Sequence, residues 1–130
     1  MEKKDIDWSN LGFGYIKTDN GAWDEGVLTD DDKVVISECA GVLQYAQTVF
    51  EGLKAYTTEK GNIVVFRPDL NAERLEQSAL RLEMPAFPRD RFVDAIVETV
   101  KANDGFVPPY GTGATLYIRP YMFGSNPVIG

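Results

Sequence analysis

Two extended runs joined by a tight turn constrain the fold of this chain most. Residues 53–57 and 63–66 are rich in apolar and β-branched side chains, and the polar residues 59–62 (EKGN) separate them. This arrangement is typical of a β-hairpin. Pro68 follows the second run and cannot donate to a strand ladder, so we expect that strand to end there. A fold organised around such a hairpin contains an antiparallel sheet.

Two helices are predicted after the hairpin. Apolar side chains recur near helical spacing in residues 70–83 and again in residues 91–102. Asp69 and Asp90 precede these segments and are candidate N-caps.

Further strands are expected at residues 11–18, 23–28, 34–37 and 114–123. Hairpins therefore dominate over strand–helix–strand crossovers. This order predicts an α+β domain with a largely antiparallel sheet and two main helices packed on one face.

Composition excludes several classes of function. The chain has 130 residues, a net charge of −7 and a pI of about 4.5. A length of 130 residues fits one domain, and so acidic a surface disfavours nucleic acid without excluding a local basic pocket for one phosphate. No apolar stretch is long enough to span a membrane. A single cysteine, Cys39, fits a reducing cytoplasm and is expected to be a buried filler.

The sequence contains no histidine. Catalytic triads, Cys–His nucleophile pairs and His-containing zinc sites are therefore excluded, and one cysteine cannot form a thiolate cage. We expect no metal site. Acid–base chemistry would have to come from carboxylates, lysine, tyrosine or a bound cofactor.

A few residues are candidates for binding or catalysis. Arg74 lies one turn into a predicted helix, where a guanidinium suits a phosphate, although pairing with a neighbouring glutamate on the same helix is the commoner outcome. Tyr117 and Arg119 are two apart on a predicted strand, so they share a face and could hold a carboxylate. Tyr45 and Phe13 are candidate pocket aromatics, for which a core position and a strand bend are the alternatives.

Lys54 is the other amine of interest, because a lysine can become a nucleophile when it is desolvated. Nothing around it in the sequence requires desolvation. We therefore expect an ordinary solvated lysine on the hairpin.

Four segments, in the same order, resemble branched-chain aminotransferases, and the match covers nearly the whole chain. They are LGFGYIKTD (11–19), QYAQTVFEGLKAY (44–56), FRPDLNAERLEQSALRLEMP (66–85) and LYIRPYMFG (116–124). The block from FEGLKAY to NAER is shared in part across the fold-type IV pyridoxal-phosphate enzymes. The LYIRP segment favours the branched-chain group.

The resemblance implies a two-domain enzyme with pyridoxal 5'-phosphate between the domains. It would move the amino group of leucine, isoleucine or valine to 2-oxoglutarate, giving a branched-chain 2-oxo acid and glutamate. Arg74 matches the arginine that holds the cofactor phosphate. Four residues match the lining of the substrate pocket: Phe13, Tyr45, Tyr117 and Arg119.

The resemblance also implies that residues 1–130 form the N-terminal small domain alone. Lys54 does not match the lysine that forms the Schiff base, which is expected beyond Gly130 together with the glutamate that pairs with the pyridine nitrogen. No catalytic residue is therefore expected here, and this chain alone should neither transaminate nor retain the cofactor. Ile129 would be an apolar tip of a loop that reaches the neighbouring subunit of a homodimer or larger homo-oligomer.

Two other interpretations remain open. One keeps the fold but changes the chemistry, to a D-amino-acid aminotransferase or an aminodeoxychorismate lyase. The other is a non-enzymatic acidic interaction domain that is complete at 130 residues. An exposed apolar face would count against this last interpretation.

Overall fold

The computed structural model describes the backbone of residues 12–14 and all of residues 22–126. Every strand pairing within this part is antiparallel, and two helices of 14 residues follow the central hairpin. The predicted α+β class is confirmed. In chain order the elements are β1 (Gly12–Gly14), β2 (Val27–Thr29), α1 (Gly41–Tyr45), β3 (Thr48–Phe50), β4 (Leu53–Thr57), β5 (Ile63–Val65), α2 (Pro68–Arg81), α3 (Arg89–Ala102), a 3-10 turn (Asp104–Phe106), β6 (Leu116–Ile118) and β7 (Tyr121–Phe123).

The central ladder is one long pairing that is interrupted in its middle. β4 pairs with β5 as the predicted hairpin and with β6 on its other side, while β3 pairs with β7. The two pairings share one register, because Phe50 faces Tyr121 and Leu53 faces Ile118. Pro120 lies at the interruption and has no N–H to donate. The strand predicted as 114–123 is therefore two short strands, β6 and β7.

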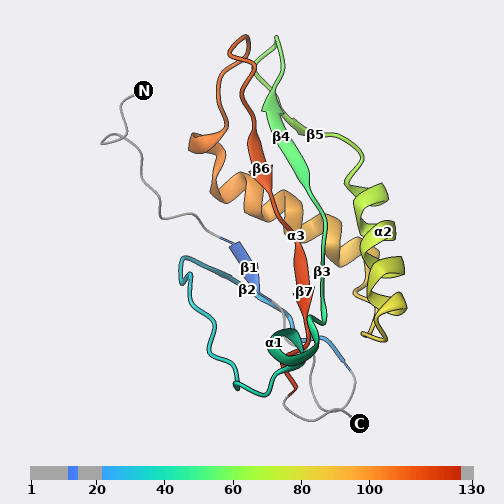
Figure 1. The fold of residues 1–130 in the computed structure, drawn as a ribbon. Helices are drawn as coiled ribbons and strands as arrows, with labels where there is room; N and C mark the ends of the chain where they lie inside the picture. Colours follow the sequence, from blue (N-terminus) through green and yellow to red (C-terminus); the bar gives the residue numbers. More distant parts are fainter. Residues whose placement is uncertain (1–11, 15–21, 127–130) are drawn as a thin grey trace.

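The two long helices cover one side of this ladder. Figure 1 shows α3 crossing behind the ladder, with α2 packed at one end of α3 and running across its direction. Alternate residues of β4 point toward the helices, and Leu53 and Ala55 are buried there. They pack with a cluster of buried helix residues: Ala72, Leu75, Ala79, Phe92, Ile96 and Val100. The prediction of two helices on one face is confirmed.

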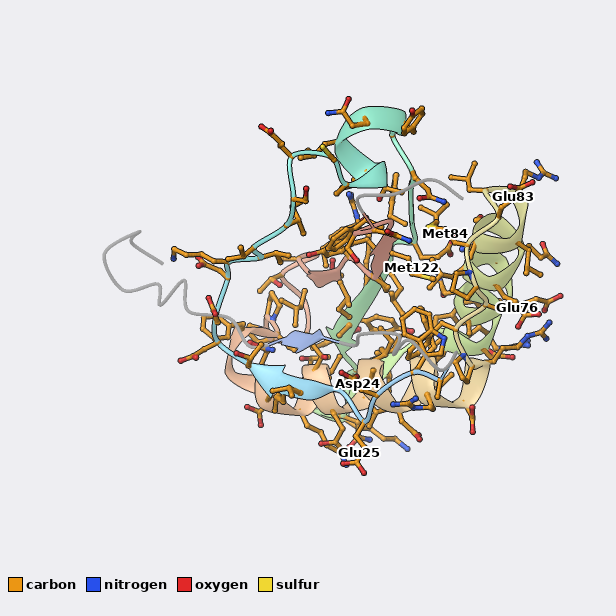
Figure 2. The ribbon with its side chains drawn as sticks, turned by 90° about the horizontal axis from the view of Figure 1, so that it is seen from below. Asp24, Glu25, Glu76, Glu83, Met84 and Met122 are labelled. Carbon is orange, nitrogen blue, oxygen red and sulfur yellow. The ribbon has the colours of Figure 1, made fainter. Side chains whose placement is uncertain are left out.

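Acidic and apolar side chains separate around α2. Figure 2 shows Glu76 and Glu83 on the outer side of this helix, while Met84 and Met122 lie inward of it. Met84 is 5% exposed, and Met122 packs against the core. Glu76 accepts two hydrogen bonds from Arg89, at 2.9 and 3.1 Å, and so ties α2 to the start of α3. The hydrogen bond from Arg89 lowers the pKa of Glu76.

The predicted helix caps are wrong. Pro88 occupies the N-cap of α3, and neither N-cap side chain makes a capping hydrogen bond. Arg67 is the N-cap of α2, with a left-handed φ of 44°, and Pro68 at the first helical position already fits the helix. Asp69 lies inside the first turn and accepts two hydrogen bonds from Arg67, at 2.9 and 2.7 Å. This pair lowers the pKa of Asp69.

Two further predictions fail between β2 and β3. Residues 34–37 form no strand, and Val35 is 99% exposed, because no neighbouring strand in the described structure pairs with them. Cys39 is exposed instead of buried. Apolar composition alone did not determine burial here.

Candidate functional site

A shallow pocket of about 400 Å³ lies where β4, the start of α2 and β6 meet. Three cationic side chains, Lys54, Arg67 and Arg74, line it together with Asn71 and Tyr117. The chain as a whole carries a net charge of −7. Asp69 offsets the charge of Arg67, so Lys54 and Arg74 are the cations of this pocket that could attract an anion.

Arg74 is held by a carboxylate from outside its own helix. Its Nε and Nη2 groups both donate to Oε1 of Glu51, at 3.0 and 2.7 Å. Glu51 follows β3 and lies 23 residues away in sequence. The expected alternative, a pair with a glutamate on the same helix, is therefore not what the structure shows. The hydrogen bonds from Arg74 to Glu51 raise the pKa of the guanidinium, so it is cationic at any physiological pH.

The guanidinium of Arg74 keeps one edge available. The Nε and Nη2 groups face Glu51, and no acceptor among the described residues pairs with Nη1. The Arg74 side chain is 61% exposed and borders the pocket. The edge formed by Nη1 and the second N–H of Nη2 is the geometry that binds two oxygens of a phosphate or carboxylate.

A second cluster lies on the face of the ladder that the helices leave open. Arg119 Nε donates to the hydroxyl of Tyr117 at 2.9 Å, and its guanidinium lies 4.3 Å from the centre of the Phe50 ring. Lys54 is the register partner of Tyr117, so its side chain is on the same face. An arginine supported by a hydroxyl and an aromatic ring is a suitable group for a carboxylate.

Gly52 joins the two clusters. Its carbonyl accepts a hydrogen bond from Asn71 at 3.2 Å, on the side of the helices. On the open side a Cβ at this position would collide with the Tyr117 hydroxyl. Glycine therefore allows Tyr117 to close over the strand, next to Arg119.

The structure brings some of the predicted site residues together and leaves others apart. Arg74 and Tyr117 line one pocket, and Arg119 joins it through Tyr117. Tyr45 ends α1, is 69% exposed and does not line that pocket. Phe13 lies in β1 opposite Leu28, but its side chain falls outside the described structure, as does all of Ile129. The pocket roles of Phe13, Tyr45 and Ile129 remain predictions.

Sequence reasoning missed the residues that support this site. Glu51, Asn71 and Phe50 were not singled out from the sequence alone. Glu51 and Gly52 lie between β3 and β4, at the point where the pairing of the ladder is interrupted. The available signal was an asparagine on the apolar face of a predicted helix, because Asn71 lies four residues before Leu75. The structure shows that Asn71 is buried. Lys54 is exposed, as predicted.

Two kinds of feature are absent from the described residues. They contain no cluster of three or more potential metal ligands. None of the helices in this part of the chain is long and apolar enough to cross a membrane.

Known proteins resemble this chain along most of its length. A branched-chain-amino-acid aminotransferase of Haemophilus influenzae is 51% identical over 98% of this chain and 39% of its own length. A methionine aminotransferase of Arabidopsis thaliana is 43% identical over 96% of this chain and 38% of its own length.

A solved structure resembles the fold as well. It is the T.th. branched-chain amino acid aminotransferase complexed with N-(5'-phosphopyridoxyl)-L-glutamate, with a TM-score of 0.64 and 29% identity. The match covers 95% of this chain and 36% of that one. No protein-family model matches the chain. The chain spans between a third and two fifths of the length of the curated relatives it matches.

Proposed function

We propose that this chain belongs to the branched-chain aminotransferase family and that residues 1–130 are the N-terminal domain of a pyridoxal-phosphate-dependent aminotransferase. The observation that carries the proposal is the free edge of Arg74 in a cationic pocket. The solved relative with a phosphopyridoxyl ligand supports a phosphate as the anion for this edge.

The residues of the pocket fit a cofactor phosphate. Arg74 would bind two phosphate oxygens through Nη1 and Nη2, and Lys54 would add positive charge to the same pocket. Arg67 also lines the pocket, but its charge is offset by its pair with Asp69. The bound cofactor would supply the electron sink that amino-group transfer needs. The part of the protein described here would contribute anchoring and orientation.

The open-face cluster would orient the substrate. Arg119 would bind a carboxylate of the amino acid or the 2-oxo acid, and the Tyr117 hydroxyl would keep the guanidinium in place by accepting from Nε. The Phe50 ring beneath the guanidinium would keep water from one side of it. Tyr45 and Phe13 would complete the pocket wall, and Ile129 would approach the neighbouring subunit.

We propose leucine, isoleucine and valine as amino donors and 2-oxoglutarate as acceptor, with branched-chain 2-oxo acids and glutamate as products. Methionine is the second candidate donor, because a relative that is 43% identical is named a methionine aminotransferase. A D-amino-acid aminotransferase and an aminodeoxychorismate lyase are less favoured, because the relatives described above are branched-chain and methionine aminotransferases.

The remaining proposals concern the whole protein. The lysine that carries the cofactor and acts as base would come from a C-terminal domain, so the present chain alone would be inactive and would not retain the cofactor. The whole enzyme would be a homodimer or larger homo-oligomer in the cytoplasm. Leu43 and Tyr45 on α1 expose apolar surface that another domain or subunit would cover in the whole protein. Such an exposed apolar surface also counts against an interaction domain that is complete at 130 residues.

The test uses the full-length enzyme that carries this segment. Arg74→Ala should weaken binding of pyridoxal phosphate by about tenfold or more and leave binding of pyridoxal, which lacks the phosphate, unchanged. Equal affinity of the two proteins for the phosphorylated cofactor would contradict the proposed role of Arg74.

A substrate panel tests the activity itself. Leucine, isoleucine, valine, methionine and D-alanine would each be assayed with 2-oxoglutarate by the glutamate formed. The branched-chain amino acids should give the highest kcat/KM. A preference for D-alanine would identify a D-amino-acid aminotransferase instead, and a preference for methionine would identify a methionine aminotransferase.

A further inference from the structure

We propose that Glu51 is the positioning residue for Arg74, and that it fixes the guanidinium so that its free edge faces a phosphate. This inference rests on the proposed function. It adds a residue that touches neither the cofactor nor the substrate and acts only through Arg74.

Glu51 is itself held by its backbone and by its burial. It lies at the interruption of the ladder, where its N–H donates to the carbonyl of Pro120 at 2.8 Å. Its position in the alternation points its side chain away from the open face and toward α2. Only 12% of that side chain is exposed. A carboxylate so placed has few other positions to adopt.

Three donors converge on a single oxygen of Glu51. Oε1 accepts from Asn71 Nδ2 at 2.9 Å as well as from both groups of Arg74. Asn71 is 6% exposed, and its amide also donates to the Gly52 carbonyl. The carboxylate is therefore held by a buried amide one helical turn before Arg74, whether or not Arg74 is engaged.

This arrangement settles which edge of Arg74 is free. An arginine side chain that is 61% exposed would otherwise sample many rotamers, and binding a phosphate would have to immobilise it. With Nε and Nη2 held by Glu51, the guanidinium is oriented in advance. Phosphate binding then needs less ordering.

The charge of Glu51 acts in the opposite direction. A carboxylate close to a bound phosphate repels it, so replacing Glu51 by a neutral residue removes a repulsion as well as a contact. The position of the acceptor and its charge must therefore be changed separately. Aspartate keeps the charge and withdraws the carboxylate by about one C–C bond, roughly 1.5 Å. Glutamine keeps the reach and one acceptor oxygen but removes the charge.

The experiment measures cofactor affinity of the full-length apoenzyme by titration with pyridoxal phosphate and, separately, with pyridoxal. Glu51→Asp should lower the affinity for pyridoxal phosphate about tenfold and leave the affinity for pyridoxal unchanged. The affinity of Glu51→Gln for pyridoxal phosphate should stay within about threefold of that of the parent, because the glutamine oxygen still reaches Arg74. Glu73→Asp is the matched control: Glu73 adjoins Arg74 in the same helix, but Arg74 pairs with Glu51 instead, so no change is expected.

A double-mutant cycle shows whether Glu51 acts through Arg74. In an Arg74→Ala background, Glu51→Asp should have no further effect on the affinity for pyridoxal phosphate. An equal loss in both backgrounds would overturn the positioning role, as would a loss that is the same for pyridoxal. If Glu51→Asp does not fold, Asn71→Ala replaces it, and an unchanged ratio of the two affinities overturns the inference.

The two proposals can fail separately. If Arg74→Ala leaves the affinity for pyridoxal phosphate unchanged, the proposed function has failed and the cycle loses its premise. If Arg74→Ala weakens it while Glu51→Asp does not, Arg74 binds the phosphate without help, and only the inference about Glu51 is wrong.

Discussion

Replacing Gly52 by alanine tests how the open-face cluster is assembled. An ideal Cβ on Gly52 would overlap the Tyr117 hydroxyl and lie 3.0 Å from Cζ and 3.1 Å from Cε2 of the same ring. Ordinary carbon contacts are about 3.5–4.0 Å, so the ring must retreat by roughly half an ångström and its hydroxyl by more. That movement removes the acceptor that holds Arg119 Nε at 2.9 Å.

The expected loss of binding energy depends on how exposed the hydrogen bond between Arg119 and Tyr117 is. A hydrogen bond to a charged group contributes about 1.5–3 kcal/mol when it is buried. Tyr117 is 48% exposed, so we take about 1 kcal/mol for the loss of Arg119 orientation. For the proposed role of Arg119 in binding a substrate carboxylate, this corresponds to an increase of about fivefold in KM for the proposed 2-oxo acid. Because the ring is at the surface and can move, the free energy of unfolding should fall by less than about 1 kcal/mol.

The assay compares steady-state kinetics and thermal unfolding of the full-length enzyme with and without Gly52→Ala. Gly105→Ala is the matched control, because nothing lies within 4 Å of a Cβ there and its φ is not in the left-handed region. We expect KM to rise for Gly52→Ala alone, with kcat changed less than about twofold. A KM equal to that of Gly105→Ala would refute the reasoning.

Three further predictions concern stability of the fold. Leu75→Ala removes a side chain that is 4% exposed in the core, so the free energy of unfolding from urea titration should fall by about 3 kcal/mol with the m-value unchanged. Glu83 follows α2 with a left-handed φ of 59°, and Glu83→Gly should raise the free energy of unfolding by about 0.5–1 kcal/mol; a lower melting temperature would contradict this. The pKa of Glu76 is lowered by its hydrogen bond from Arg89, so the pair stabilises the fold above the ordinary glutamate pKa and ceases to do so as pH falls through the lowered value. Melting curves of the parent and Glu76→Gln should therefore differ at neutral pH and converge in acid.

The candidate site was only partly predictable. The family resemblance singled out Arg74, Tyr117 and Arg119. In the structure Arg74 and Tyr117 line one pocket, and Arg119 is hydrogen-bonded to Tyr117. The partner of Arg74 could not be found in the same way. Local spacing favours glutamates of the same helix, whereas Glu51 reaches Arg74 only because β3 lies against α2. Sequence proximity carries no information about such a contact.

The sequence by itself determined the local elements of this protein. The hairpin of residues 53–65 and the two long helices follow from alternation, helical spacing and the positions of Gly61 and Pro68, all of which act within a few residues. The interruption of the ladder at Pro120 is also determined locally, because the N–H group that proline lacks is a property of that residue alone.

Tertiary structure alone decided which surfaces were covered and which side chains met. Val35 and Cys39 are exposed despite apolar character, since no element packs over them in the described structure. Glu51 became the partner of Arg74, and Gly52 gave Tyr117 room beside Arg119, because one ladder brings distant parts of the chain together. Burial and pairing at such distances depend on the packing of the whole chain.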